Sequence, residues 1–142
     1  MPDPPSPKIT YGEFPFHLVY EIDGMQVIVE DSLICEYNGI GMDEGRGKFR
    51  QWKKYLASGN ERISLLRVND YKEIYYDPGP DWYYMGDVDE TNYDHAFPNA
   101  SYIEEDGQIT RRGEISEKEL VEQYNIKLLG WEPSPPIENI FE

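Results

Sequence analysis

The sequence predicts an α+β fold: mainly an antiparallel sheet built from hairpins, with one or two short helices. Three observations predict it: an alternating apolar run that ends at an Asp-Gly pair, two further hairpin patterns, and one marked helix start. A length of 142 residues fits a single core. We expect one domain over residues 13–132, an extended N-terminal arm over residues 1–12 and a proline-rich C-terminal tail over residues 133–142.

The first expected element is a hairpin. Apolar residues alternate with others from Phe14 to Ile22, which is the pattern of a half-buried strand. The Asp23-Gly24 pair that follows accepts the positive φ angles of a type I′ turn. A two-residue loop would create three apolar pairs: Ile22 with Met25, Tyr20 with Val27, and Leu18 with Val29. Turn chemistry and apolar pattern therefore agree on one register.

The middle of the chain is harder to interpret. Residues 33–37 predict a third strand, and the glycine-rich residues 38–47 predict a flexible connection. This segment matches neither phosphate-binding glycine pattern, and its acidic residues would repel a phosphate. In residues 49–57, Phe49, Trp52 and Leu56 share a helical face, which favours a helix. A strand with Trp52 and Leu56 inward also fits.

Two more hairpins are expected. Residues 62–68 and 72–76 carry apolar groups on both faces, which predicts a hairpin central to the sheet. Its expected pairs are Leu66 with Ile74, Leu65 with Tyr75, and Arg67 with Glu73. After an irregular region from 77 to about 101, Asp106-Gly107 predicts an exposed ribbon. Its expected pairs are Glu104 with Ile109 and Ile103 with Thr110.

A helix and a final strand complete the expected fold. Ser116 and Glu119 have the spacing of a capping box, and Ile115 can pack on Leu120 as a hydrophobic staple. Asn125 is a residue that tolerates the left-handed conformation at a helix end. Residues 126–131 predict the last strand.

Composition excludes several classes of function. A net charge of -15 argues against direct binding of nucleic acid through its phosphates. No apolar run approaches the ~20 residues that span a bilayer, so we expect no membrane association. Residues 1–10 lack the basic and apolar regions of a signal peptide. The single cysteine, Cys35, excludes an internal disulfide framework and fits a reducing compartment, which predicts a cytoplasmic protein.

Patterns for catalysis or metal binding are weak. There are two histidines, no G-x-S-x-G motif, and a cysteine in an apolar run that suits a buried hydrophobe better than a thiolate. Residues 87–95 begin like a calcium loop, but Asn92 and Pro98 stand where glycine and glutamate are needed. A weak divalent-ion site remains open there. We expect a protein that is not an enzyme and uses no cofactor.

Tyrosines and acidic residues gather in one stretch. Ten acidic residues and no lysine or arginine lie between Lys72 and Arg111, together with many of the twelve tyrosines. Aromatic side chains dominate interface hot spots, and carboxylates attract a basic partner. We predict a partner-binding surface made of Tyr76, Asp77, Asp81, Trp82, Tyr84, Asp87, Asp89, Tyr93 and Asp94. Tyr75 and one of Tyr83 and Tyr84 are expected in the core.

These observations favour an acidic interaction protein, such as an inhibitor or immunity-type protein, that docks a basic protein surface. One alternative is a glycan or small-molecule binder with a platform of Trp82, Tyr83 and Tyr84. Another is an assembly subunit whose proline-rich ends pack on a neighbour. The basic cluster of residues 46–54 is expected to pair with the chain's own acids. The sequence leaves the oligomeric state open.

Overall fold

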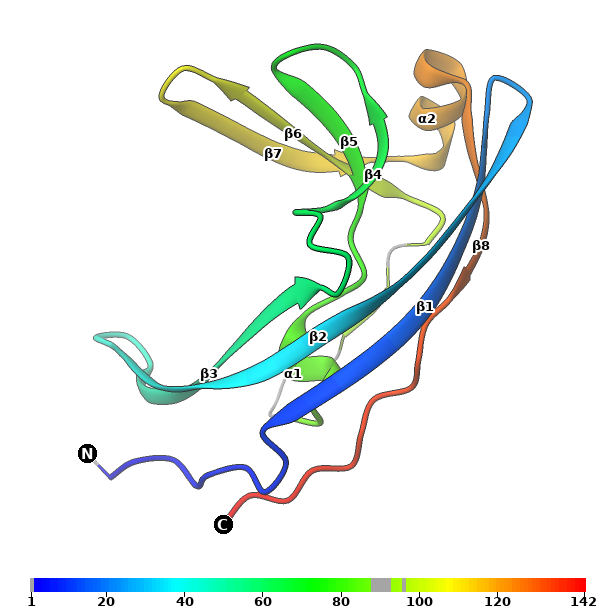
Figure 1. Ribbon diagram of the computed structural model, residues 1–142. Coiled ribbons are helices and arrows are strands. Elements are labelled where there is room, and N and C mark those ends of the chain that lie inside the picture. The colour runs from blue at the N-terminus through cyan, green and yellow to red at the C-terminus, as the bar shows by residue number, and fades with distance from the viewer. Residues whose placement is uncertain (1, 88–92, 96) are drawn as a thin grey trace.

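The computed structural model describes residues 2–87, 93–95 and 97–142 (Figure 1). Within them, eight strands form two four-stranded antiparallel sheets, accompanied by two short helices. The strand order is β3-β2-β1-β8 in the first sheet and β4-β5-β6-β7 in the second. This arrangement confirms the predicted α+β class with a sheet built from hairpins.

The elements follow one another along the chain. The first sheet consists of β1 (Tyr11–Ile22), β2 (Met25–Asp43), β3 (Gly47–Leu56) and β8 (Ile126–Glu132). The second consists of β4 (Ile63–Arg67), β5 (Lys72–Tyr76), β6 (Ala100–Asp106) and β7 (Ile109–Ile115). Helix α1 (Asp81–Tyr84) follows β5, and α2 (Glu117–Tyr124) connects β7 to β8. Figure 1 shows β1 and β2 as a long curved hairpin, with both chain ends at the end of it opposite the turn.

The first hairpin has the predicted register. Ile22 pairs with Met25, and the other two expected apolar pairs also form. Asp23 and Gly24 have φ angles of 51° and 79°, the positive values that a type I′ turn needs. The local sequence therefore determines this hairpin.

Strand β2 corrects two expectations. Residues 33–37 are not a separate third strand but the middle of β2, and residues 38–43 continue the same strand instead of forming a loop. The register with β3 shifts between Tyr37 and Ile40, where Gly39 has a φ of 81°. Such a bulge lets a long strand bend without ending. The glycines of this segment therefore serve a bent strand and a tight turn.

Strand β3 corrects a third expectation. Residues 49–56 form a strand, so the favoured helix is wrong and the alternative is right. Trp52 pairs with Tyr37 and Lys54 with Cys35 of β2. The ladder with a long neighbouring strand overrides the helical spacing of these few apolar residues. Trp52 and Leu56, four apart, share one face of the strand, whereas Phe49 lies on the other.

The second hairpin is correct in part. Leu66 pairs with Ile74 and Arg67 with Glu73 as predicted, but Ser64 instead of Leu65 faces Tyr75. The register shifts here. β4 is an edge strand, so the hairpin as a whole is not central to its sheet.

The third hairpin forms in a register two residues from the expected one. Asp106 pairs with Ile109, and Glu104 with Arg111. The turn is therefore Gly107-Gln108, and Gly107 has a φ of 63° at its first position, the place where a type II′ turn favours glycine. Most of β7 is exposed, as expected of a ribbon, whereas Ile103 of β6 is buried.

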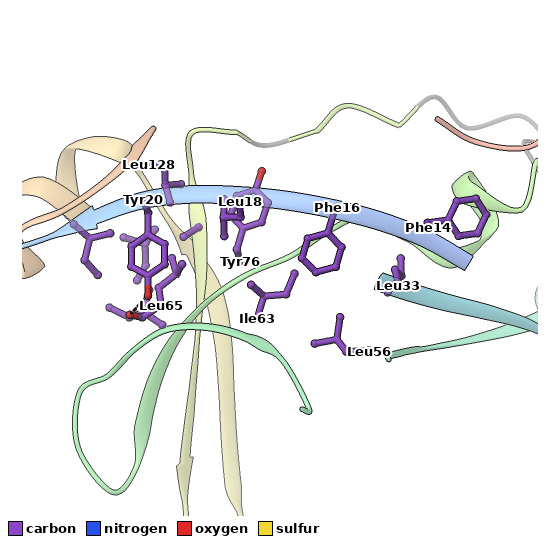
Figure 2. Packing of buried hydrophobic residues seen from close by; sticks show 14 of the residues in the cluster. Phe14, Phe16, Leu18, Tyr20, Leu33, Leu56, Ile63, Leu65, Tyr76 and Leu128 are labelled. Atoms are coloured by element: carbon purple, nitrogen blue, oxygen red, sulfur yellow. Dashed lines mark hydrogen bonds between the residues drawn. The ribbon is translucent and has the colours of Figure 1, made fainter. Parts of the chain in front are cut away.

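One apolar cluster lies between the two sheets (Figure 2). From the first sheet, alternate residues of β1 point into it: Phe14, Phe16, Leu18 and Tyr20. From the second sheet come Ile63, Leu65, Ile74 and Tyr76. The Tyr20 hydroxyl donates a hydrogen bond to the Leu65 carbonyl at 3.1 Å, so a buried polar tip also joins the sheets.

Helix α2 has the predicted ends. The Ser116 hydroxyl oxygen accepts a hydrogen bond from the Glu119 backbone N–H at 3.2 Å, and Asn125 adopts the left-handed conformation with a φ of 52°. Ile115 and Leu120 are both buried in the core cluster. The Asp23 backbone N–H donates to the Asn125 carbonyl at 3.1 Å, so the tip of the first hairpin is fixed to the end of α2.

The two terminal segments lie against the domain and against each other. Ser6 and Glu142 exchange two backbone hydrogen bonds of 3.0 Å. The Asn139 side-chain amide donates to the carbonyls of Ile9 and Met85 at 2.9 Å each. The proline-rich ends are therefore extended, and they pack on their own domain.

Candidate functional site

The segment after β5 is attached to the first sheet by one carboxylate. Asp87 accepts hydrogen bonds from Arg50 Nε at 3.0 Å, Arg50 Nη2 at 2.7 Å and Trp52 Nε1 at 2.8 Å. The side chains of Arg50 and Asp87 are only 16% and 11% exposed. Burial alone would raise the pKa of Asp87, but the hydrogen bonds from Arg50 and Trp52 outweigh it and lower that pKa. Asp87 thus acts as a structural clamp.

A second attachment comes from the same face of β3. Lys54 Nζ donates to the Gly79 carbonyl at 2.9 Å and lies 3.8 Å from the Asp77 carboxylate. Arg50, Trp52 and Lys54 are spaced two apart, so they share the face of the strand that points towards α1. Four of the five cations in residues 46–54 pair with the chain's own acids, as expected: Lys48, Arg50, Lys53 and Lys54.

Two of the predicted surface tyrosines lie in the core. Tyr76 is 2% exposed and Tyr84 3% exposed. The Tyr84 ring packs on Phe14 with centroids 5.0 Å apart, and the Tyr76 ring packs on Trp131 at 4.8 Å. Tyr75, expected in the core, is half-buried beside the Arg62 guanidinium instead. Because Tyr84 is buried, a platform of Trp82, Tyr83 and Tyr84 is not presented to a glycan.

A half-buried imidazole organises the other aromatic residues. His95 forms hydrogen bonds with the hydroxyls of Tyr76 and Tyr93, one at each ring nitrogen. Its ring stacks on Trp131, with centroids 5.4 Å apart and an angle of 11°. Burial lowers the pKa of His95, while the charge of Asp77 opposes this in part. Burial also raises the pKa of Tyr93 to about 12, so both groups are neutral near pH 7.

Six of the nine predicted surface residues are exposed or half-buried, and one of them, Asp87, has its carboxylate occupied by Arg50 and Trp52. Asp77 and Asp94 are exposed, and Asp81, Trp82 and Tyr93 are half-buried. The rings of Trp82 and Tyr93 meet edge to face, with centroids 6.3 Å apart. We call these residues the acidic face: Asp77, Asp81, Trp82, Tyr93 and Asp94. Asp89 lies outside the described residues.

A hollow of about 760 Å³ lies between β3 and α1. Its lining includes three cations and two carboxylates: Arg46, Lys48, Arg50, Asp81 and Asp87. Trp52 and Trp82 also contribute to it. Sequence analysis finds the basic residues but does not place them beside α1. The spacing of two between Lys48, Arg50 and Trp52 is the signal that could have done so.

The remaining candidates are Cys35 and the calcium-like segment. Cys35 is fully buried, as expected, and burial raises the pKa of its thiol to about 12, which keeps it protonated. Across residues 2–87, 93–95 and 97–142, no three His, Cys, Asp or Glu side chains are grouped as metal ligands would be. Residues 88–92 of the calcium-like segment lie outside that range.

The comparisons with known proteins leave the site to be interpreted from its own chemistry. No family model, curated protein or solved structure matches this chain. In the part of the chain that the structure describes, no helix is long and apolar enough to cross a membrane.

Proposed function

We propose that this is a non-enzymatic interaction protein that docks the basic surface of another protein through its acidic face. The observation that carries the proposal is that Asp77, Asp81 and half-buried Trp82 lie on the segment that the Asp87 clamp attaches to β3, and that the Trp82 ring meets half-buried Tyr93, the neighbour of exposed Asp94. An inhibitor or immunity-type protein would act in this way.

Fixed carboxylates and aromatic rings suit docking for two reasons. Side chains that are already ordered lose less conformational entropy when a partner binds. Half-buried Trp and Tyr rings supply contact area together with a polar tip. Asp77 and Asp94 are exposed, although Lys54 lies 3.8 Å from the Asp77 carboxylate. A basic partner can therefore reach these two carboxylates.

The whole molecule supports the same partner chemistry. Its net charge of -15 attracts a cationic surface and accelerates the encounter, an effect that salt weakens. The same charge repels nucleic acid. A basic protein is therefore the partner that the charge favours, and cytoplasmic localisation remains part of this proposal.

Affinity capture tests the proposal. The tagged protein is incubated with lysate and eluted in steps of rising salt, and the released protein is purified for titration. We expect the double variant Asp77→Asn/Asp94→Asn to weaken binding by about tenfold, with little change in melting temperature. The Asp77→Asn change keeps a side-chain oxygen that can accept the Gly79 N–H, as the Asp77 carboxylate does.

A matched control separates the site from net charge. Asp70→Asn/Asp106→Asn removes the same two charges from exposed turns of the second sheet. If this control weakens binding equally, or if no basic protein is captured, docking through the acidic face is wrong.

A further inference from the structure

The hollow along β3 has a local charge opposite to that of the molecule. Three cations and two carboxylates line it, whereas the whole chain carries a net charge of -15. Strand β3 is also the outermost strand of its sheet, so one edge of its backbone has no neighbouring strand among the described residues. A cationic edge strand beside two tryptophans can receive an extended chain.

The N-terminal segment already occupies one end of the hollow. Asp3 Oδ1 lies 2.8 Å from Lys48 Nζ, and the Pro5 carbonyl accepts a hydrogen bond from Arg50 Nη1 at 3.1 Å. Pro4, between them, lines the hollow. Figure 1 shows this segment running alongside the β2–β3 end of the first sheet. The β3 side chains thus bind a carboxylate and a main-chain carbonyl of an extended acidic segment.

Arg46 adds a cation that the N-terminal segment does not use. Its guanidinium lies over the Phe49 ring, 4.2 Å from the centroid, and no carboxylate of the described residues pairs with it. Arg46 is exposed at the turn before β3. A carboxylate placed there would extend the pattern that Asp3 begins at Lys48.

We propose that the hollow along β3 binds an extended acidic peptide segment of a partner protein, and that residues 3–5 compete with this peptide for the same place. Carboxylates of the peptide pair with Arg46 and Lys48. An aromatic or aliphatic side chain of the peptide packs on Trp82. The negative field of the rest of the molecule limits the ligand to a short segment, because a long polyanion would be repelled.

This site borders the acidic face but has the opposite charge preference, and each proposal is tested at residues that the other surface does not contain. Asp81 and Trp82 belong to both surfaces, so neither test changes these two residues. Arg46 and Lys48 belong to the hollow alone, and Asp77 and Asp94 belong to the acidic face alone. Failure of one proposal therefore leaves the other intact.

The test is fluorescence anisotropy with the full-length protein. The probe is a short fluorescein-labelled peptide of alternating aspartate and phenylalanine, and its asparagine counterpart is the control peptide. We expect only the acidic peptide to bind. Lys48→Gln and Arg46→Gln should each weaken its binding by about tenfold. Arg46 is exposed, so its variant remains informative if Lys48→Gln does not fold.

Two matched variants sharpen the result. Lys53→Gln removes a cation from the opposite face of β3, where Lys53 pairs with Glu36 at 3.1 Å, and should leave affinity unchanged. Asp3→Asn removes the internal competitor and should tighten binding by about threefold. Asp106→Asn changes the net charge equally from the tip of β6 and should have no such effect.

Three outcomes would overturn the proposal. One is the absence of binding by the acidic peptide, and another is equal tightening by Asp3→Asn and Asp106→Asn, which would reflect net charge alone. The third is binding of a neutral probe, cellohexaose, with an affinity that Lys48→Gln and Arg46→Gln do not change. That result would show that the hollow binds hydroxylated ligands and not acidic peptides.

Discussion

The first hairpin and the segment after β5 are ordered in different ways. In the hairpin, neighbouring residues determine the structure: Asp23-Gly24 forms the turn and alternate apolar residues determine the register. In residues 77–87, contacts from far along the chain do so, chiefly Arg50 and Trp52 on Asp87. The comparison shows that a local pattern suffices where strands are adjacent, whereas an irregular segment depends on side chains that a distant strand supplies.

The largest expected effect comes from the core side of the hairpin. Leu18 is fully buried between the two sheets, so Leu18→Ala should lower the free energy of unfolding by about 2–5 kcal/mol. Ile28 is the control, because it lies on the outer face of the same hairpin and is 55% exposed. Urea unfolding of Leu18→Ala and Ile28→Ala measures the difference. Equal losses would show that the hairpin is not anchored by its inner face.

Loss of the Asp87 clamp should have the second-largest effect on the free energy of unfolding. Asp87→Asn removes the charge that pairs with Arg50 and leaves a partly buried guanidinium poorly compensated, which should cost about 2 kcal/mol. Asp94→Asn, at an exposed position, is the matched control and should cost little. If the two variants unfold at the same urea concentration, the clamp does not hold residues 77–87.

The same clamp gives a pH dependence. Because the folded-state pKa of Asp87 is lowered, its contribution to stability is present above the ordinary pKa and is lost as pH falls through the folded-state value. Asp87→Asn should therefore flatten the stability profile in the acid range. A variant with an unchanged acid profile would contradict this assignment.

The smallest expected effect on stability is the one that the titration of His95 produces. Its pKa is lowered in the folded state, so the unfolded chain takes up the proton first as pH falls through the ordinary histidine value. Stability should therefore decrease below about pH 6.5. In His95→Gln this decrease should shrink, whereas His17→Gln, which removes a half-exposed histidine near Glu30 and Glu132, should retain it. Thermal melting from pH 7.5 to 5 measures both.

Structure that depends on neighbouring residues can be predicted from this sequence, whereas structure that depends on distant residues cannot. The Asp-Gly turn and the caps of α2 each depend on residues within a few positions, and both are predicted correctly. β3 is not, because its partner is a bent strand whose sequence resembles a glycine-rich loop.

The candidate site shows the same limit. Which tyrosines face inward depends on the shift at Leu65 and on the pairing of β5, so the sequence-based prediction puts Tyr75 in the core and Tyr76 on the surface. In the sequence Asp87 resembles one more surface acid, because its partners lie 37 and 35 positions away. A variant that changes Asp87 would thus disturb folding as well as docking, which is why the docking test leaves it intact.

The placement of the tryptophans has an optical consequence. Each of the three has its own contact: Trp52 donates to Asp87 of the clamp, Trp82 meets Tyr93 at the border of the hollow, and Trp131 stacks on His95. The intrinsic fluorescence of the protein therefore combines three separate signals. Versions that retain a single tryptophan would follow the Asp87 contact, the Tyr93 contact or the His95 contact one at a time, with no added dye.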